Sequence, residues 1–273
     1  MVFVEYLKSV LLGIVEGITE WLPISSTGHM ILLNDFMNTD SGFFGSQIYL
    51  YVIQLGAILA IASLYFGKLN PFAPSKNGAE KKNTWQMWFK VIIGCLPAAV
   101  IGLGLNDFMD QFSTPVVVAS MLILYGIGFL FIEKKSKTES VKTITDMSYK
   151  TALMIGLFQA LSVVPGTSRS GSSILGAMIL GTSRPVAAEF SFFMAIPVMV
   201  GVSFLKIITN DYVMTPFEWG LLLTGMITAY LVSMASVKFL MNYVRKHDFK
   251  AFGWYRIVLG IIVLAVAAFK YFA

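Results

Sequence analysis

Charged residues are scarce in this sequence. Of its 273 residues, only 13% are Asp, Glu, Lys or Arg, and 56% are hydrophobic. Soluble domains carry roughly 25% charged residues. So few charges cannot cover a water-facing globular surface, and several apolar runs reach the ~20 residues that are needed to cross a bilayer. The composition therefore excludes an ordinary soluble domain and indicates an integral membrane protein.

Cysteine is nearly absent as well. The single cysteine, Cys95, lies in an apolar run, which excludes a disulfide framework and a cysteine-based metal site. The formal net charge is +5, but the basic residues gather in the loops between apolar runs. This distribution favours a topology signal, or attraction to anionic membrane lipids, over a nucleic-acid-binding patch.

Six apolar runs have the length and composition of full membrane helices. They are residues 47–66, 87–105, 115–132, 186–206, 219–243 and 252–272. Lys and Arg cluster at 67–86, 133–150 and 245–250, whereas 34–46, 106–114 and 207–218 contain neither. Because basic loops stay cytoplasmic, we place the three basic loops inside and the three others outside.

Two further apolar segments, 5–33 and 151–183, are interrupted by proline, glycine and hydroxyl residues. The interruptions are Pro23-Ile24-Ser25-Ser26-Thr27-Gly28 and Pro165-Gly166-Thr167-Ser168-Arg169-Ser170-Gly171. The loop topology requires 5–33 to enter and leave from the outside and 151–183 from the cytoplasm, with both termini outside. Broken backbone at membrane depth is tolerated only where it is buried in protein or lines a wet cavity. The two breaks therefore mark an internal site.

The chain reads as a hairpin plus three spans, twice over, within a single integral membrane domain of residues 1–273. Repeat one covers 1–132 and repeat two covers 151–273, and Gly13–Glu20 aligns with Gly156–Val163. Three spans is an odd number, so the second repeat is inverted. The expected fold class is an all-α polytopic membrane protein with six transmembrane helices and two re-entrant helical hairpins in inverted-topology repeats. Such repeats usually hold their polar site near the midplane.

The first broken segment carries ionisable residues, which are costly inside a membrane and are functional candidates by default. Glu16 and Glu20 are four residues apart and share one helix face. Such a pair can bind Mg²⁺ or Ca²⁺, which prefer oxygen ligands, or share a proton; a purely structural pair of protonated glutamates is the alternative. His29 shares this hairpin with the acids and with Ser25-Ser26-Thr27, which favours a catalytic histidine over a structural one.

The second break carries a positively charged side chain, that of Arg169. Arg169 stands at the expected start of a half-helix, where free N–H groups and the helix dipole favour an anion. Its guanidinium can bind phosphate oxygens through two hydrogen bonds, and the hydroxyls of Ser168, Ser170 and Ser173 surround it. We therefore expect a phosphate-binding site, with a structural arginine that neutralises the two glutamates as the alternative.

Two weaker candidates lie within the full spans. Gln54 stands in the middle of the first span and Glu189 near the start of the fourth. Each is expected to support the residues that touch the phosphate, unless it only bonds neighbouring backbone.

These motifs resemble those of a known family. The run from Glu16 to His29, EGITEWLPISSTGH, closely resembles the acidic, serine-rich motif of bacterial undecaprenyl-diphosphate phosphatases of the bacitracin-resistance family. Pro165–Gly171 is similar to their second motif, and Glu189–Phe192 is a further match. The length and span pattern agree, so the resemblance covers essentially the whole chain. Where family members often have threonine two residues after the motif glycine, this sequence has Ser173, which keeps the hydroxyl.

The resemblance implies a function. It implies removal of the terminal phosphate from undecaprenyl diphosphate, which recycles the lipid carrier for peptidoglycan synthesis and confers bacitracin resistance. It also implies a divalent cation, Mg²⁺ or Ca²⁺, and a bacterial inner-membrane protein with an outward-facing site. The family's essential positions map onto Glu16, Glu20, Ser26, His29 and Arg169.

Chemistry and resemblance together give a mechanistic hypothesis. Arg169 and the hairpin N–H groups hold the diphosphate, while Glu20 with Glu16 holds the cation. Ser26 attacks the terminal phosphorus, and His29 accepts its proton or donates one to a leaving oxygen. Direct attack by water, with Ser26 only binding phosphate, stays open. The hypothesis requires the two breaks to meet tip to tip, so that the acids and histidine of one face the arginine of the other.

Rival functions share the same features. A transporter or flippase also uses inverted repeats and charges at the midplane, and hydrolysis could be combined with return of the product lipid. A non-catalytic scaffold does not explain five polar groups at two matched breaks. The expected partners are a polyprenyl diphosphate and membrane lipids, with no nucleic acid; the sequence leaves a monomer and a homodimer both open.

Overall fold

The computed structural model describes residues 2–37, 42–134, 139–209 and 212–272, which are mostly helical. The α-helices are α1 Val2–Thr19, α2 Ser26–Met37, α3 Gln47–Leu64, α4 Phe66–Leu69, α5 Gly78–Asp110, α6 Pro115–Lys134, α7 Tyr149–Ala160, α8 Arg169–Ile179, α9 Arg184–Ile208, α10 Pro216–Val244 and α11 Lys250–Phe272. Two short 3₁₀ helices are η1 Phe43–Gly45 and η2 Leu161–Val163. Across the described ranges there is no extended strand, only an isolated bridge between Val141 and Thr182. The all-α fold class is confirmed.

Six helices are long and apolar enough to cross a membrane: α3, α5, α6, α9, α10 and α11. They coincide with the six predicted spans. The start of α5 was predicted wrongly, because the helix begins at Gly78 rather than at 87. Asn77 and Glu80 each accept a hydrogen bond from the other's backbone N–H, at 3.0 and 2.8 Å. This capping box starts the helix within a polar segment that hydropathy alone assigns to a loop.

Both interrupted segments form two α-helices separated by a break, and the second break includes the short 3₁₀ helix η2. α1 ends at Thr19 and α2 begins at Ser26, while α7 ends at Ala160 and α8 begins at Arg169. Directly before each second helix stands a serine in the left-handed region, Ser25 with φ 74° and Ser168 with φ 69°. Serine adopts this conformation rarely. The two breaks therefore share an uncommon local geometry at positions that the repeat alignment makes equivalent.

The first helix of each interrupted segment packs on a long helix from the other half of the chain. α1 packs along α10, and α7 packs along α5. Glycines allow both contacts: a Cβ on Gly13 would lie 2.5 Å from the carbonyl oxygen of Gly225, and one on Gly156 would lie 2.1 Å from that of Gly94. A side chain at either glycine would therefore separate the helices.

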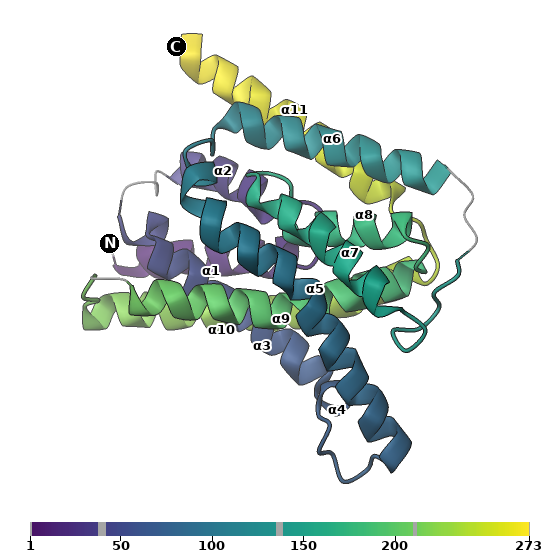
Figure 1. Ribbon diagram of the computed structural model, residues 1–273. Helices are drawn as coiled ribbons and strands as arrows, with labels where there is room; N and C mark the ends of the chain where they lie inside the picture. The colour runs from purple at the N-terminus through teal and green to yellow at the C-terminus, as the bar shows by residue number, and fades with distance from the viewer. Residues whose placement is uncertain (1, 38–41, 135–138, 210–211, 273) are drawn as a thin grey trace.

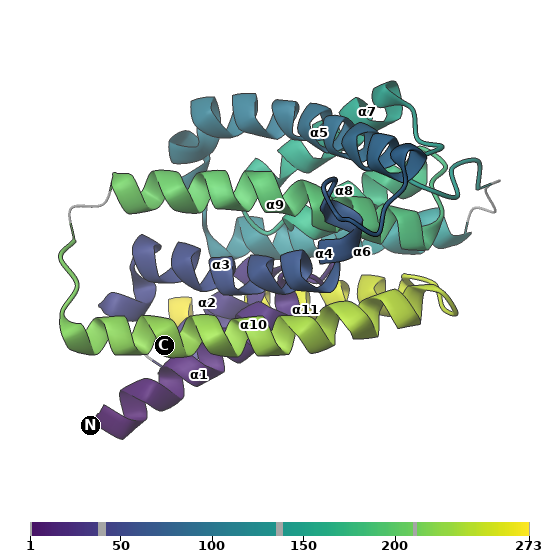
Figure 2. The ribbon, with the colours of Figure 1, turned by 90° about the horizontal axis from the view of Figure 1, so that it is seen from below.

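Of the second helices of the interrupted segments, α8 is buried inside the bundle and α2 is partly buried. α6 and α11 pack side by side along one side of the molecule (Figure 1), and α6 touches both α2 and α8. In the view from below, α5 and α7 lie at one face of the molecule, α9 lies next to them, and α10 with α1 lies at the opposite face (Figure 2). This packing brings the starts of α2 and α8 together in the interior.

Candidate active site

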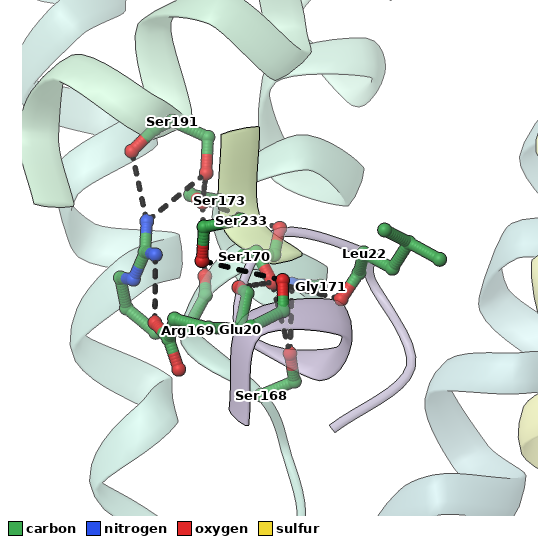
Figure 3. Close-up of polar contacts among 10 residues, drawn as sticks. Glu20, Leu22, Ser168, Arg169, Ser170, Gly171, Ser173, Ser191 and Ser233 are labelled. Atoms are coloured by element: carbon green, nitrogen blue, oxygen red, sulfur yellow. Dashed lines mark hydrogen bonds and ion pairs between the residues drawn. The ribbon is translucent and has the colours of Figure 1, made fainter. Parts of the chain in front are cut away.

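The two breaks meet through an ion pair. Nη2 of Arg169, the first residue of α8, donates to Oε1 of Glu20 at 2.9 Å (Figure 3). Both side chains are nearly buried, with exposed fractions of 12% and 8%. Ser170 adds a second link, because its hydroxyl lies 3.1 Å from the carbonyl oxygen of Glu20. The expected approach of Glu20 to Arg169 is confirmed.

The remaining donors of Arg169 are directed to α9 and to the interior. Nη1 donates to the carbonyl oxygen of Ser191 at 2.9 Å, and the guanidinium lies 5.5 Å from the ring of Trp21. Nε is buried and has no partner among the described residues. A buried donor without a partner is costly, and Arg169 is among the residues that line the cavity described below.

Sequence reasoning named Glu189 and passed over Ser191, two residues further along α9. Glu189 does not contact the Glu20–Arg169 pair in any described interaction; its Oε1 accepts from Nζ of Lys68 at 2.5 Å. Ser191 instead accepts from Arg169 through its carbonyl oxygen, and its hydroxyl oxygen lies 2.6 Å from that of Ser173. The sequence did point to Ser191, because this residue lies within Glu189–Phe192, the third segment that resembles the family's motifs.

The serines at the start of α8 differ in whether they line the cavity beside the ion pair. Ser168 caps the helix, since its hydroxyl accepts from the N–H of Gly171 at 3.1 Å. Ser173 is buried in the helix and donates to the carbonyl oxygen of Arg169 at 2.9 Å. Ser168 and Ser170 line the cavity described next, and Ser173 does not.

A cavity of about 260 Å³ opens beside the ion pair. Its polar wall comes from both breaks and from α3, and it includes Glu20, Ser26, Thr27, Ser168, Arg169 and Gln54. Gln54 therefore lies at the cavity wall, and its supporting role stays a prediction. Ser25 does not line the cavity; it is buried, and its hydroxyl has no partner within the described chain.

His29 does not face Arg169, contrary to expectation. Its Nδ1 lies 2.7 Å from the carbonyl oxygen of Ser25, one helical turn earlier, and its Nε2 lies 2.7 Å from the hydroxyl of Tyr255 on α11. A carbonyl only accepts, so Nδ1 carries the hydrogen. This bond to its own helix turns the ring toward α11. His29 therefore contacts the segment that holds Ser26 rather than the cavity itself.

The two glutamates differ in their surroundings. Glu16 is buried, and its Oε1 has no hydrogen-bond partner among the described residues. Within those residues no group of three or more His, Cys, Asp and Glu side chains could hold a metal. The pair nevertheless offers carboxylate oxygens, the donors that Mg²⁺ and Ca²⁺ prefer. A cation held by these two carboxylates would need its other ligands from phosphate and water, and Glu20 but not Glu16 lines the cavity.

Arg256 is a buried residue between the two breaks that sequence reasoning missed. It lies on α11, is fully buried, and donates to carbonyl oxygens of both breaks: Pro23 at 3.2 Å, Gly166 at 3.1 Å and Thr167 at 2.9 Å. A fourth bond goes to Leu122 of α6 at 3.4 Å. One guanidinium thus ties the two breaks and α6 together. A charged residue inside a predicted span was the available signal.

These features define a polytopic membrane protein with a polar cavity and a nearly buried ion pair where two broken helices meet. The chain belongs to the bacitracin resistance protein BacA family, which it matches over residues 9–262.

Curated relatives are similar over nearly their full lengths. An undecaprenyl-diphosphatase of Enterococcus faecalis is 52% identical, with 99% of this chain and 100% of the relative aligned. An undecaprenyl-diphosphatase of Latilactobacillus sakei is 53% identical over 97% of this chain and 98% of the relative. Undecaprenyl-diphosphatase 1 of Clostridioides difficile is also 53% identical, over 96% of each chain.

Proposed function

We propose that this protein hydrolyses undecaprenyl diphosphate to undecaprenyl phosphate and inorganic phosphate, which recycles the lipid carrier for peptidoglycan synthesis and confers bacitracin resistance. The observation that carries the proposal is the Glu20–Arg169 pair at the wall of a cavity that is lined by hydroxyls from both breaks. The names of the relatives support the same activity.

Arg169 and the start of α8 bind the terminal phosphate in this proposal. The unpartnered Nε of Arg169 donates to a phosphate oxygen, and the positive end of the α8 dipole adds to the attraction. Donors that are already fixed by Glu20 and Ser191 need little reorganisation as charge develops in the transition state.

Ser26 is the proposed nucleophile. Its oxygen attacks the terminal phosphorus, the bond to the bridging oxygen breaks, and undecaprenyl phosphate leaves; water then cleaves the phosphoserine to release inorganic phosphate. His29 accepts the Ser26 proton only if Nε2 leaves Tyr255. In the present geometry it instead holds the carbonyl of Ser25, the residue before the nucleophile. Attack by water, with Ser26 binding phosphate, is the second route.

Glu16 and Glu20 are the proposed holders of a divalent cation, Mg²⁺ or Ca²⁺. The unpartnered Oε1 of Glu16 supports this assignment. A bound cation would neutralise charge on the phosphate oxygens. Glu20 then has two tasks, since it also fixes the orientation of Arg169.

The proposed membrane arrangement has two re-entrant hairpins in inverted repeats, in the bacterial inner membrane, with the cavity facing outward. Equivalent packing of α1 on α10 and of α7 on α5 supports the repeats. The residues of the full spans that line the cavity come from the halves of α3, α5 and α9 next to the loops that contain no Lys or Arg, such as Tyr51, Gly102 and Val202. Basic loops stay cytoplasmic, so these halves lie toward the outside.

Phosphate release from undecaprenyl diphosphate by the purified protein in liposomes tests the proposal. We expect release that EDTA abolishes and that Mg²⁺ or Ca²⁺ restores, and a loss of at least about 100-fold in Glu20→Ala. Glu80→Ala, which removes a glutamate of the α5 capping box, is the matched control and should stay active. A wild-type protein that moves the lipid across the bilayer without releasing phosphate would instead be a transporter.

A further inference from the structure

The cavity beside Arg169 has a second, apolar wall. Ala98 and Gly102 of α5 and Val198 and Val202 of α9 line it, and we name these four residues the α5–α9 groove. None of the four side chains can donate a hydrogen bond to a phosphate oxygen. A ligand that fills the whole cavity must therefore be anionic at one end and apolar at the other.

α5 and α9 are in close contact just before the groove begins. The sulfur of Cys95 lies 3.4 Å from the carbonyl oxygen of Met194, and a Cβ on Gly94 would lie 2.6 Å from the sulfur of Met194. Each helix then contains a proline, Pro97 in α5 and Pro197 in α9. Proline removes a backbone donor and disfavours a straight helix. The groove residues follow directly after these two prolines.

Gly102 leaves the groove wide. No atom lies within 4 Å of the position that a Cβ on Gly102 would take, and Ala98, one helical turn earlier, lines the same cavity. The groove also reaches the molecular surface, because Val202, which lines it, is 36% exposed. An apolar chain can therefore run from the cavity to the lipid-facing surface of α5 and α9.

We propose that the first isoprene units of a prenyl diphosphate lie in the α5–α9 groove while its phosphates lie at Arg169, and that Gly102 determines how well the chain fits. This inference rests on the proposed function. The occupant is the substrate's own chain rather than a bilayer lipid, because the groove and the phosphate-facing hydroxyls belong to one cavity. A chain that is covalently joined to a phosphate at Arg169 has to leave through that cavity.

Gly102→Leu tests the inference in steady-state hydrolysis of undecaprenyl diphosphate at a fixed detergent and lipid composition. We expect KM to rise about tenfold, the effect of a few methyl groups in an apolar pocket, with little change in kcat. Loss of binding that is the same in ground and transition states raises KM alone. A fall in kcat instead would indicate a distorted catalytic site and would overturn the inference.

Gly104→Leu is the matched control. Gly104 lies on the same helix with open space around its Cβ position, but it does not line the cavity. Its KM should equal that of wild type, and both variants should unfold at the wild-type temperature. An unchanged KM in Gly102→Leu, or an equal rise in Gly104→Leu, contradicts the groove. A wild-type protein that releases no phosphate contradicts the proposed function instead.

Discussion

Nε2 of His29 and the hydroxyl oxygen of Tyr255 lie 2.7 Å apart, and their rings are nearly parallel with centroids 5.6 Å apart. The contact joins the start of α2 to α11, two elements separated by most of the sequence. It also occupies the ring nitrogen that general-base chemistry would need. Tyr255 therefore influences whether His29 can act as a base.

Removing the Tyr255 hydroxyl should weaken catalysis if His29 acts by holding the Ser25 carbonyl, because the ring then loses the contact that orients it. A hydrogen bond of this kind contributes about 1 kcal/mol, so Tyr255→Phe should lower kcat by roughly fivefold. If His29 is instead the general base, freeing its Nε2 should keep or raise the activity. The same change in a His29→Ala background should have no further effect, because interacting residues are not additive. Tyr243→Phe is a suitable control, since Tyr243 stacks on His247 away from the breaks. Additive losses in the double variant would show that Tyr255 acts independently of His29.

Arg169→Lys should be severely impaired even though the charge is kept. Lysine cannot donate to Glu20 and Ser191 in the fixed geometry of a guanidinium and still leave a donor for phosphate. The expected loss in kcat/KM is at least about 100-fold. Arg245→Lys, at the exposed end of α10, should be unaffected. Activity of Arg169→Lys near that of wild type would refute phosphate binding by the Arg169 guanidinium.

Ser26→Ala distinguishes the two routes of hydrolysis. If Ser26 is the nucleophile, turnover should fall by at least about 1,000-fold, while the amount of lipid diphosphate bound changes little. Wild-type protein quenched during turnover should carry phosphate on Ser26. Ser162→Ala, which removes a hydroxyl from the same cavity, should cost less than about tenfold. Substantial hydrolysis by Ser26→Ala would leave water as the attacking group.

Arg256→Lys should lower both stability and kcat. A lysine cannot satisfy four carbonyl oxygens from three segments, and an unsatisfied buried carbonyl costs about 1–3 kcal/mol. The resulting shift in the two breaks should reduce kcat about tenfold or more with a small change in KM.

Arg184→Lys is the matched control for Arg256→Lys. Arg184 makes a two-point contact with Glu133, at 2.8 and 2.6 Å, outside the cavity. Loss of this contact in Arg184→Lys should lower the unfolding temperature, whereas the kcat of the folded fraction should not change. An equal kcat in both variants would mean that Arg256 only stabilises the fold.

The sequence predicts the membrane helices and the breaks because both are local signals. An apolar run of sufficient length predicts a span, and a Pro-Gly-Ser interruption predicts a break. The Glu20–Arg169 contact was also predictable, since two buried opposite charges at matched breaks have few other partners.

Other features depend on which helices pack together, and no local pattern encodes that. The bond of His29 to Tyr255, the pairing of Glu189 with Lys68 and the position of Arg256 all join elements distant in sequence. Residue spacing along one helix gives no information about them. The polar start of α5 was missed for a different reason, because a hydropathy pattern does not register a helix that extends beyond the bilayer.

The position of Arg256 has a consequence for biogenesis. Backbone carbonyls of both breaks accept hydrogen bonds from a side chain on α11. A nascent chain that has inserted only the helices before α11 therefore still lacks this connection. Enzymatic competence should then arise late in synthesis, after the translocon has released α11, rather than growing as each helix is added.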